Sequence, residues 1–280
     1  MLKGLSGAGL GKVSSNQHLI ELAANHQFQA VDLDALSLIN EMSGVQNAKY
    51  LLAKHDVAIG SIGLSVDWRS TEENFQAGLS KLAEQAEAAA ALGCTSCCTY
   101  ILPATNEPAA LFMAKAIRRL KTCAQILGAY NVRLGLEFVG PHHLRTAWEN
   151  SFIWSMEDTL EMIAAIGEPN VGLLLDAIHW YTNEGTIDDL LQLKAEQIVH
   201  VHINDAPDVK VEDVLDNGRL YPGEGVIDLV AFLQALQTIG YKGAIAQEIL
   251  TAEAPTESAE TLAERSGRLY KQLFEKARIS

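Results

Sequence analysis

Basic residues are scarce in this sequence, which has 21 lysines and arginines against 35 aspartates and glutamates and a formal net charge of −14 at pH 7. Such a balance repels nucleic-acid phosphates and anionic lipid headgroups, so we expect neither a nucleic acid nor a membrane as partner. The sequence also lacks an apolar run of the roughly 20 residues that a bilayer span needs, and its start, Met1–Gly7, is too short and glycine-rich for a signal peptide. We therefore expect a cytoplasmic protein whose partner is a small molecule recruited through a cation.

Cysteine is equally sparse, and the four cysteines predict no disulfide framework. Cys94, Cys97 and Cys98 lie in a strand-like run and Cys123 lies in a helical pattern, which is typical of thiols in a reducing compartment. Cys94 and Cys97 have CxxC spacing, but no second pair follows and the run around them is β-like. We interpret them as buried apolar thiols rather than as a metal or redox site. A chain of 280 residues, 48% of them hydrophobic, can bury a substantial core without such staples.

Short apolar runs rich in Val, Ile and Leu alternate with longer helical patterns along the chain, and no linker interrupts the alternation. This pattern predicts an α/β fold built from βα units. The predicted strands are Lys3–Gly7, Ala30–Ala35, Ala58–Val66, Thr95–Leu102, Arg133–Val139, Val171–Ala177, Ile198–Asn204 and Ala244–Ile249. The predicted helices cover about 15–27, 41–55, 72–92, 108–129, 156–167, 187–195, 227–239 and 257–277.

Eight such units give 35 residues per unit, close to the roughly 30 per unit of a (β/α)8 TIM barrel. We expect one barrel domain over residues 1–280. A doubly wound sheet is the main alternative, and it usually has a glycine-rich turn after its first strand. The segment Gly7-Ala8-Gly9-Leu10-Gly11 offers glycines there but breaks the final spacing of the dinucleotide-binding fingerprint, so the barrel is favoured.

Four consecutive predicted strands each end in a polar residue: Glu137, Asp176, His202 and Glu248. Barrel enzymes carry their active sites at the carboxyl ends of the strands, so we expect these side chains to meet. Three carboxylates crowded over an apolar floor repel one another unless a cation neutralises them. We therefore predict that all four hold one divalent metal ion, and Mn, Zn, Mg and Co all suit this donor set. The alternative is four separate strand-end groups bonded to loops or helix N-termini.

A metal beside carboxylates can polarise a hydroxy-carbonyl compound and stabilise its enediolate while a base moves a proton. We expect an isomerase or epimerase in which Glu137 and Glu248 face opposite sides of the substrate and form the acid/base pair. A metal-dependent dehydratase of the same fold is the nearest alternative, and a non-catalytic binding barrel is another. A repair endonuclease of the same barrel type is disfavoured, because it would need more inward histidines than a chain with 8 can supply and a basic face for DNA.

Three further polar residues are predicted to contact the substrate: His179, Asp205 and Arg219. His179 follows Asp176 by three residues and could donate to a substrate oxygen, although a surface loop histidine is the competing interpretation. Asp205 directly follows the strand of His202 and is placed to orient that ring. Arg219 offers a planar fork for a carboxylate, a hydroxyl pair or a phosphate, against the default of an exposed loop arginine.

Two other features stay open. His200 points inward beneath His202 and is interpreted as a core or supporting histidine rather than as a ligand. The long loop that follows Glu137, Pro141–Ser155, is a substrate lid, a second metal position or an oligomer contact. Its polar and aromatic candidates are His142, His143, Arg145 and Trp148.

These strand ends resemble the sugar phosphate isomerase/epimerase family of xylose isomerase-like TIM barrels, and within it most of all the 2-keto-myo-inositol (inosose) isomerases. The resemblance is strong from about Asn131 to Leu250 and diffuse before that. It rests on Leu136-Glu137-Phe138-Val139-Gly140, Asn170-Val171-Gly172-Leu173-Leu174-Leu175-Asp176-Ala177-Ile178-His179, His202-Ile203-Asn204-Asp205 and Tyr221-Pro222-Gly223-Glu224-Gly225-Val226-Ile227-Asp228.

The resemblance implies a metal bound by the four strand-end residues, with His179 and Arg219 on the substrate and the two glutamates as the acid/base pair. It implies a sugar, sugar phosphate or cyclitol ketone as substrate, in carbohydrate or inositol metabolism, and it leaves a homo-oligomer open. Three departures concern the substrate. Leu250-Thr251-Ala252 stands where inosose isomerases carry an arginine, Glu224 replaces a glutamine, and the loop Pro141–Ser155 is longer and richer in His and Trp.

Overall fold

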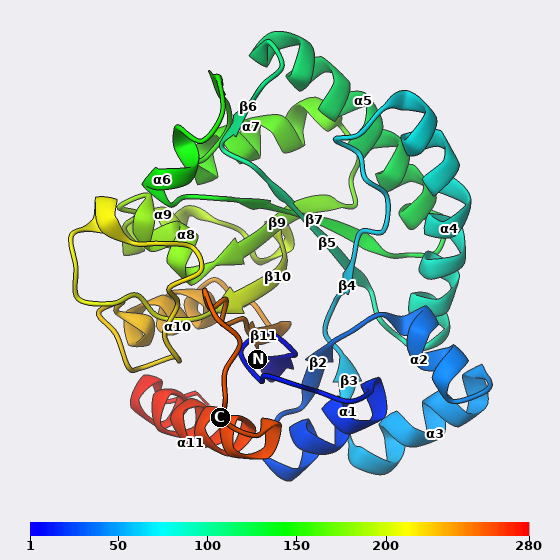
Figure 1. Cartoon of the computed structure of the whole chain (residues 1–280), viewed down its shortest axis with the longest axis vertical. Helices are drawn as coiled ribbons and strands as arrows, with labels where there is room; N and C mark the ends of the chain where they lie inside the picture. The colour runs from blue at the N-terminus through cyan, green and yellow to red at the C-terminus, as the bar shows by residue number, and fades with distance from the viewer. Residues whose placement is uncertain (280) are drawn as a thin grey trace.

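Parallel strands form the centre of the molecule and helices surround them (Figure 1). The computed structural model describes residues 1–279, and within them nine strands form one sheet with the order β3-β2-β1-β11-β10-β9-β7-β5-β4. Their bounds are β1 (Leu2–Ser6), β2 (Ala30–Asp32), β3 (Ala58–Ile59), β4 (Ile62–Gly63), β5 (Ser96–Ile101), β7 (Arg133–Phe138), β9 (Val171–Asp176), β10 (Ile198–Ile203) and β11 (Ala244–Gln247). This confirms the predicted α/β TIM barrel.

The sheet nearly closes into a barrel through the segment that contains β3 and β4. β3 and β4 lie at the two edges of the sheet, yet only Gly60 and Ser61 separate them in the chain. The Gly60 amide donates to the carbonyl of Val31 in β2 at 2.8 Å, and the Leu64 amide donates to the carbonyl of Cys98 in β5 at 2.9 Å. The continuous strand predicted over Ala58–Val66 is therefore two short strands, because the segment leaves one neighbour to join the other.

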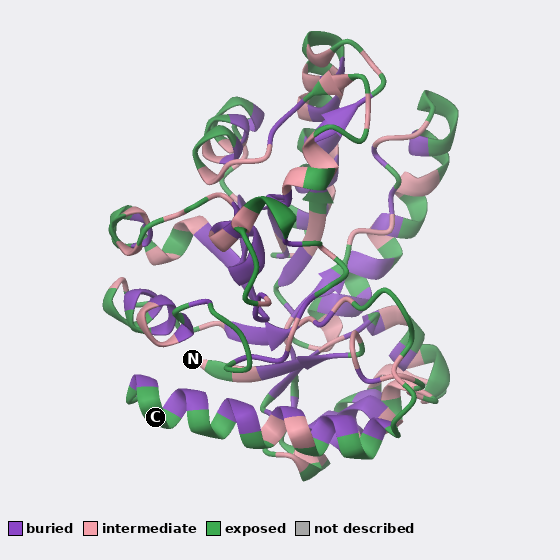
Figure 2. Cartoon of the chain, turned by 60° about the vertical axis from the view of Figure 1, so that its left-hand side comes forward, coloured by how far each residue is buried: buried purple, intermediate pink, exposed green. Residues whose placement is uncertain are grey.

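Most of the helices begin at a side chain that accepts a backbone N–H, as with Ser15, Thr71, Ser155 and Ser258. Each long helix buries one face against the barrel and exposes the other to solvent (Figure 2). The buried faces are mostly apolar. The helices are α1 (Asn16–Asn25), α2 (Ala35–Glu41), α3 (Val45–His55), α4 (Glu72–Ala91), α5 (Ala109–Gly128), α6 (His142–Arg145), α7 (Met156–Ile166), α8 (Ala177–Thr182), α9 (Ile187–Gln192), α10 (Leu229–Thr238) and α11 (Ala259–Ala277).

The last helix completes the ring. α11 buries Leu262, Leu269 and Leu273, the stripe expected of a helix that packs inward, and it lies beside α1 (Figure 1). The apolar core is continuous from the first βα unit to this helix. In the part of the chain that the structure describes, no helix is both long and apolar enough to span a membrane.

Two short helices differ from the prediction, and each has a capping aspartate at its start. Asp34 accepts the N–H of Ser37, so α2 begins at Ala35, where a strand was predicted. Asp176 ends β9 and accepts the N–H of Ile178, so α8 follows without a loop. The missed signal was the same in both places: an aspartate at the end of an apolar run is an N-cap as well as a strand-end group.

Candidate functional site

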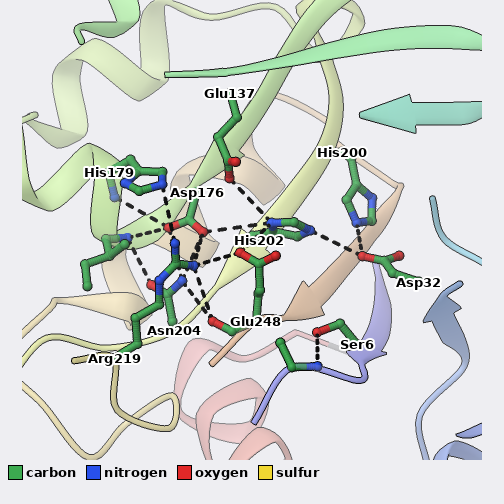
Figure 3. A network of polar contacts seen from close by, with 12 residues as sticks. Ser6, Asp32, Glu137, Asp176, His179, His200, His202, Asn204, Arg219 and Glu248 are labelled. Carbon is green, nitrogen blue, oxygen red and sulfur yellow. Dashed lines mark hydrogen bonds and ion pairs between the residues drawn. The ribbon is translucent and has the colours of Figure 1, made fainter. Parts of the chain in front are cut away.

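The four strand-end residues meet at the carboxyl end of the barrel (Figure 3). Glu137 is near the end of β7, Asp176 ends β9, His202 is near the end of β10, and Glu248 directly follows β11. These four strands are consecutive neighbours in the sheet, so their ends share one side of the barrel mouth. One ligand atom of each residue lies within 4.8 Å of the others. The sequence therefore placed these side chains together correctly, and their binding of a metal stays a prediction.

The imidazole of His202 faces the three carboxylates with one nitrogen. Its Nδ1 lies 3.3 Å from Glu248 Oε2, 3.5 Å from Glu137 Oε1 and 3.9 Å from Asp176 Oδ2. Neither Nδ1 nor Glu137 Oε1 has a partner in hydrogen-bond geometry among residues 1–279, although both atoms are buried. Buried polar atoms are nearly always partnered, so this pair of orphans indicates that a further group belongs between them. Three carboxylate oxygens and one imidazole nitrogen fit a divalent cation.

Burial and opposite charge act against each other on these carboxyl groups. Burial raises the pKa of Glu137 above its ordinary value. Burial also opposes ionisation of Asp176 and Glu248, but there the opposite charges prevail: Arg219 chiefly lowers the pKa of Asp176, and His202 and Arg219 lower that of Glu248. For His202, burial lowers the pKa, and the charge of Glu248 with the other acceptors raises it well above the ordinary range. The three carboxylates therefore give the site an excess of negative charge, which cations can offset.

Arg219 is one such cation and is buried rather than exposed. Its side chain is 1% exposed, and its Nη1 donates to Asp176 Oδ2 at 2.9 Å and to Glu248 Oε2 at 2.8 Å. Its Nη2 donates to Asp216 Oδ1 at 2.7 Å. The competing interpretation of an exposed loop arginine is therefore wrong, and contact of Arg219 with a substrate stays a prediction. Arg219 is not among the residues that line the neighbouring pocket, although it contacts Glu248, which is one of them.

His179 also lies inside the protein, in the first turn of α8. Its Nδ1 accepts the Gly140 amide at 3.4 Å, which leaves the ring hydrogen on Nε2. Nε2 lies 3.9 Å from Asp216 Oδ1 and 3.5 Å from Arg219 Nη2. The surface-loop interpretation is therefore wrong, and His179 belongs to the same polar network as the strand-end residues (Figure 3).

Asn204 is a member of this network that the sequence analysis missed. Its Nδ2 donates to both oxygens of Asp176, at 3.1 and 3.0 Å, and its Oδ1 accepts the Ile178 amide at 3.0 Å. The amide thus holds the Asp176 carboxylate in one orientation. The signal was available, because Asn204 is two residues after His202 and so continues the same face of its strand.

Asp205 lies apart from the site. It is fully buried, and its two oxygens accept four backbone amides, from Ala206, Gly223, Gly225 and Ile227, at 2.9 to 3.0 Å. Burial raises the pKa of this carboxyl group although the four N–H groups oppose the shift. Because its oxygens accept the amides of the 223–227 loop, Asp205 neither contacts His202 nor lines the pocket. It was expected to orient the His202 ring and to contact the substrate.

Asp32 is the second residue that the sequence analysis missed. It ends β2, and its Oδ2 lies 2.8 Å from His200 Nε2 and 3.3 Å from His202 Nε2. Burial opposes ionisation of Asp32, but His200 and His202 lower its pKa well below the ordinary value. Like the four strand-end residues, Asp32 is a polar residue at the end of an apolar run, so the same sequence pattern would have predicted it. His200 is buried beneath His202, as expected.

A cavity of about 320 Å³ opens in front of the site. Glu137, His202 and Glu248 line it, together with Leu174 of β9 and residues of the first four βα units. Those other lining residues are Ser6, Asp32, Leu33, Asp34, Ser61, Ile62, Gly63, Cys98, Thr99, Tyr100 and Leu174. A small polyol fits such a volume, and its hydroxyls would find several oxygen acceptors there.

The long loop after β7 is anchored outside the site. β8 (Asn150–Ser151) pairs antiparallel with β6 (Ala104–Thr105), and α6 contacts the turn at Val211–Asp213. Arg145 donates to the carbonyls of Gly140 and Thr182, each at 2.8 Å. Among residues 1–279, this loop contributes no member to a cluster of potential metal ligands, which argues against the second-metal interpretation.

Several known proteins share this fold and parts of this sequence. An inosose isomerase of Bacillus velezensis is 34% identical over 48% of this chain and 45% of its own length. A ketose 3-epimerase of Arthrobacter globiformis is 29% identical over 78% of this chain and 72% of its own, and a 3-dehydroshikimate dehydratase of Pseudomonas aeruginosa is 29% identical over 55% and 22%. The chain spans about half the length of the curated inosose isomerases that it matches.

Solved structures extend the likeness to nearly the whole chain. A xylose isomerase domain protein of Alicyclobacillus acidocaldarius has a TM-score of 0.91 and 33% identity, with 99% of both chains covered. The crystal structure of an IolI protein with a bound zinc atom has a TM-score of 0.82 and 20% identity, again over 99% of both, and shows the common fold. The model of the xylose isomerase-like TIM barrel matches residues 20–272. The chain belongs to the xylose isomerase-like TIM barrel family.

Proposed function

We propose that this chain is a divalent-metal-dependent isomerase or epimerase of a sugar or cyclitol, with Glu137 and Glu248 as its proton-transfer pair. One observation supports this above the others: His202 Nδ1 and Glu137 Oε1 are buried without hydrogen-bond partners among residues 1–279, and two more carboxylates complete their surroundings. The inosose isomerase and ketose 3-epimerase among the relatives support the reaction class, and the zinc of the IolI protein supports a metal.

Glu137, Asp176, His202 and Glu248 would hold the cation. When bound, a divalent cation polarises a carbonyl group and stabilises the negative charge that develops when a proton leaves the neighbouring carbon. Asn204 and Arg219 fix Asp176, so this ligand is held in place before a cation arrives.

Glu137 and Glu248 are suited to proton transfer by where they lie. Both line the cavity, and β9 and β10 separate their strands in the sheet, so the two carboxyl groups approach a bound substrate from different sides. One can take the proton from the carbon next to the carbonyl. The other can return a proton to the opposite face of that carbon, or to the former carbonyl carbon while the neighbouring hydroxyl proton passes to the carbonyl oxygen. The first outcome is epimerisation and the second is isomerisation.

Metal content is the first test, measured by elemental analysis on gently purified protein and on Asp176→Ala. We expect about one equivalent of Mn, Zn, Co or Mg in the wild type and its loss in the variant. Asp213→Ala, in a turn outside the site, is the matched control and should keep the metal. A wild-type chain that remains metal-free after soaking with each cation would contradict the proposal and favour a binding barrel.

Turnover is the second test, on free ketoses and cyclitol ketones in deuterated water. An isomerase or epimerase incorporates solvent deuterium at the carbon next to the carbonyl, and NMR of the product separates the two. A dehydratase would instead release water and form a new double bond. The 3-dehydroshikimate dehydratase among the relatives supports a dehydratase as the second candidate function. Its substrate class carries a carboxylate, however, and the acidic lining of the cavity disfavours binding of an anion.

A further inference from the structure

Asp32 and His200 join His202, one of the four strand-end residues, in a second group of polar side chains, none of them more than 12% exposed. We call it the Asp32 cluster. Asp32 Oδ2 lies 2.8 Å from His200 Nε2 and 3.3 Å from His202 Nε2 (Figure 3). The proposed reaction uses His202 but neither Asp32 nor His200, although burying an ionised carboxylate is costly unless it has a task or partners.

The Asp32 contact crosses the inside of the barrel. Asp32 ends β2 and His202 is in β10, and β1 and β11 lie between these strands in the sheet. The side chain fits because residue 60 is glycine: a Cβ there would come within 2.6 Å of Asp32 Oδ1 and 3.3 Å of His200 Cε1. The backbone of the β3–β4 junction thus holds the carboxylate against the histidines from the far side.

The chemistry of the two groups decides where the imidazole hydrogen lies. An ionised carboxylate can only accept hydrogen bonds, so the His202 nitrogen that faces Asp32 must carry a hydrogen. A histidine must be neutral to bind a metal, so the metal-binding form of His202 has one N–H, and when that hydrogen is on Nε2, the lone pair is on Nδ1. Nδ1 is the atom that faces Glu137, Asp176 and Glu248. The contact with Asp32 therefore selects the one tautomer that presents a ligand atom to the carboxylate side.

We propose that Asp32 is a positioning residue for the metal site: through His202 Nε2–H it fixes the ring so that Nδ1 is available as a ligand, and His200 holds Asp32 in place. This inference rests on the proposed function. His200 suits that role because its Nε2 shares Asp32 Oδ2 with His202 and its ring lies nearly perpendicular to that of His202, at 85° and 5.2 Å between centroids. Partners of this kind orient metal-binding histidines and raise their affinity.

The test measures Zn²⁺ affinity directly, by competition with a chromophoric chelator, and needs no substrate. We expect Asp32→Asn to bind Zn²⁺ about 10–100-fold more weakly than the wild type, with one zinc per chain in both. Asp228→Asn is the matched control, because Asp228 caps α10 outside the lining of the cavity. Asparagine can still accept the Ala231 amide and cap α10. Its Zn²⁺ affinity should stay within about threefold of the wild type.

A second readout separates positioning from general loosening. In zinc-loaded protein labelled with ¹⁵N-histidine, the His202 Nε2–H proton should give a downfield, slowly exchanging signal because Asp32 accepts it. In Asp32→Asn that signal should move upfield or be lost to solvent exchange, while the circular dichroism spectrum of the zinc-free protein stays that of the folded wild type. Asp228→Asn should leave the signal in place.

Gly60→Ala provides a second variant if Asp32→Asn does not fold. Its Cβ displaces the Asp32 carboxylate without removing charge, so it should weaken Zn²⁺ binding in the same direction. Wild-type Zn²⁺ affinity in Asp32→Asn with an unchanged Nε2–H signal would overturn the inference, and so would two zinc ions per chain, since the Asp32 cluster would then hold a metal itself. A wild-type chain that binds no zinc would instead refute the proposed function.

Discussion

Arg219 donates to Asp176 Oδ2 at 2.9 Å, and this is the same oxygen that faces His202 Nδ1 at 3.9 Å. One ligand atom of the proposed metal site is thus already shared with a buried guanidinium. Arg219 also donates to Glu248 Oε2, so two of the three carboxylates share the single positive charge of one resident cation. Arg219 therefore contacts two of the carboxylates from one side, and the four strand-end residues leave room for a second cation between them.

Replacing Arg219 should make the protein depend on metal for its stability. Arg219→Met leaves Asp176 and Glu248 buried without their partner, and breaking a buried pair in this way costs about 3–5 kcal/mol. We expect the free energy of unfolding in chelator to fall by roughly this amount, and saturating Zn²⁺ to restore more stability to the variant than to the wild type. Urea denaturation with and without Zn²⁺ measures both effects.

The matched control for Arg219 is Arg265→Met, which removes a half-exposed partner of Glu224. Such surface pairs contribute about 0–1 kcal/mol, so this variant should differ little from the wild type in either condition. Equal losses in the two variants, or a loss in Arg219→Met that Zn²⁺ does not reduce, would show that the guanidinium does not neutralise the site.

Each glutamate of the proposed proton-transfer pair should be needed for turnover. Glu137→Gln and Glu248→Gln keep the side-chain shape and one oxygen ligand but remove the group that exchanges a proton. We expect kcat to fall by about 10²–10⁴-fold in each, since a positioned general base contributes that much. Deuterium incorporation into the substrate, measured at equal metal loading, should fall in parallel. Glu161→Gln on the exposed face of α7 is the control, and wild-type rates in both site variants would disprove the pair.

Much of this site follows from local sequence rules. Four polar residues at the ends of consecutive apolar runs meet in space because parallel strands of a barrel end at the same rim. The same rule applied to the run that ends at Asp32 would have found a fifth. Asn204 could have been predicted from the two-residue alternation of side chains along the strand of His202. These residues were within reach of sequence reasoning, because strand ends and strand faces are properties of short segments.

The burial of the loop residues could not be read in the same way. Arg219 and Asp205 precede or follow loops whose path depends on contacts between distant segments: Asp205 pairs with Leu220, and Gly218 with Thr251, as isolated antiparallel bridges. These bridges bring Arg219 inside and direct Asp205 away from the site. Charge alone suggested an exposed arginine, because the carboxylates that offset its desolvation come from other strands.

Asp205 should prove to hold a loop rather than the site. Asp205→Ala removes the acceptor of the Gly223, Gly225 and Ile227 amides, and a buried group left without its partner costs about 1–3 kcal/mol. We expect a loss of that size in urea denaturation, together with faster hydrogen exchange at those three amides. Zn²⁺ affinity should stay within about threefold of the wild type. A tenfold weaker affinity with unchanged stability would instead support the role of orienting His202.

The cysteines should behave as inert apolar groups in the native protein. Burial raises the pKa of Cys94 and of Cys123 to about 12, and the pKa of Cys97 and Cys98 well above the ordinary value. Because the thiolate is the reactive form, we expect no thiol to react with Ellman's reagent within minutes at pH 8, and all four to react after denaturation. Rapid reaction of a pair in native protein would revive the redox interpretation of the CxxC spacing, and Cys94→Ser would identify it.

The charge of the cavity should select against phosphorylated substrates. Asp32, Asp34, Glu137 and Glu248 line it, and its lining, taken over residues 1–279, includes neither lysine nor arginine. A phosphate about 6 Å from one such carboxylate meets a repulsion of roughly 2–3 kcal/mol per unit charge at an effective dielectric constant of 20, which a bound divalent cation offsets only in part.

We therefore expect kcat/KM for a free ketose or cyclitol ketone to exceed that of its phosphate ester by at least about tenfold. Asp34→Asn removes one lining carboxylate that is no proposed ligand, so it should narrow this ratio by a few-fold, mainly by lowering KM for the ester. Paired kinetics on the two compounds, with wild type and Asp34→Asn at equal metal loading, measure the ratio. A preference for the ester would mean that a cationic group from outside the described cavity lining binds the phosphate. An unchanged ratio of kcat/KM in Asp34→Asn would show that the charge of the lining does not cause the preference for the free ketone.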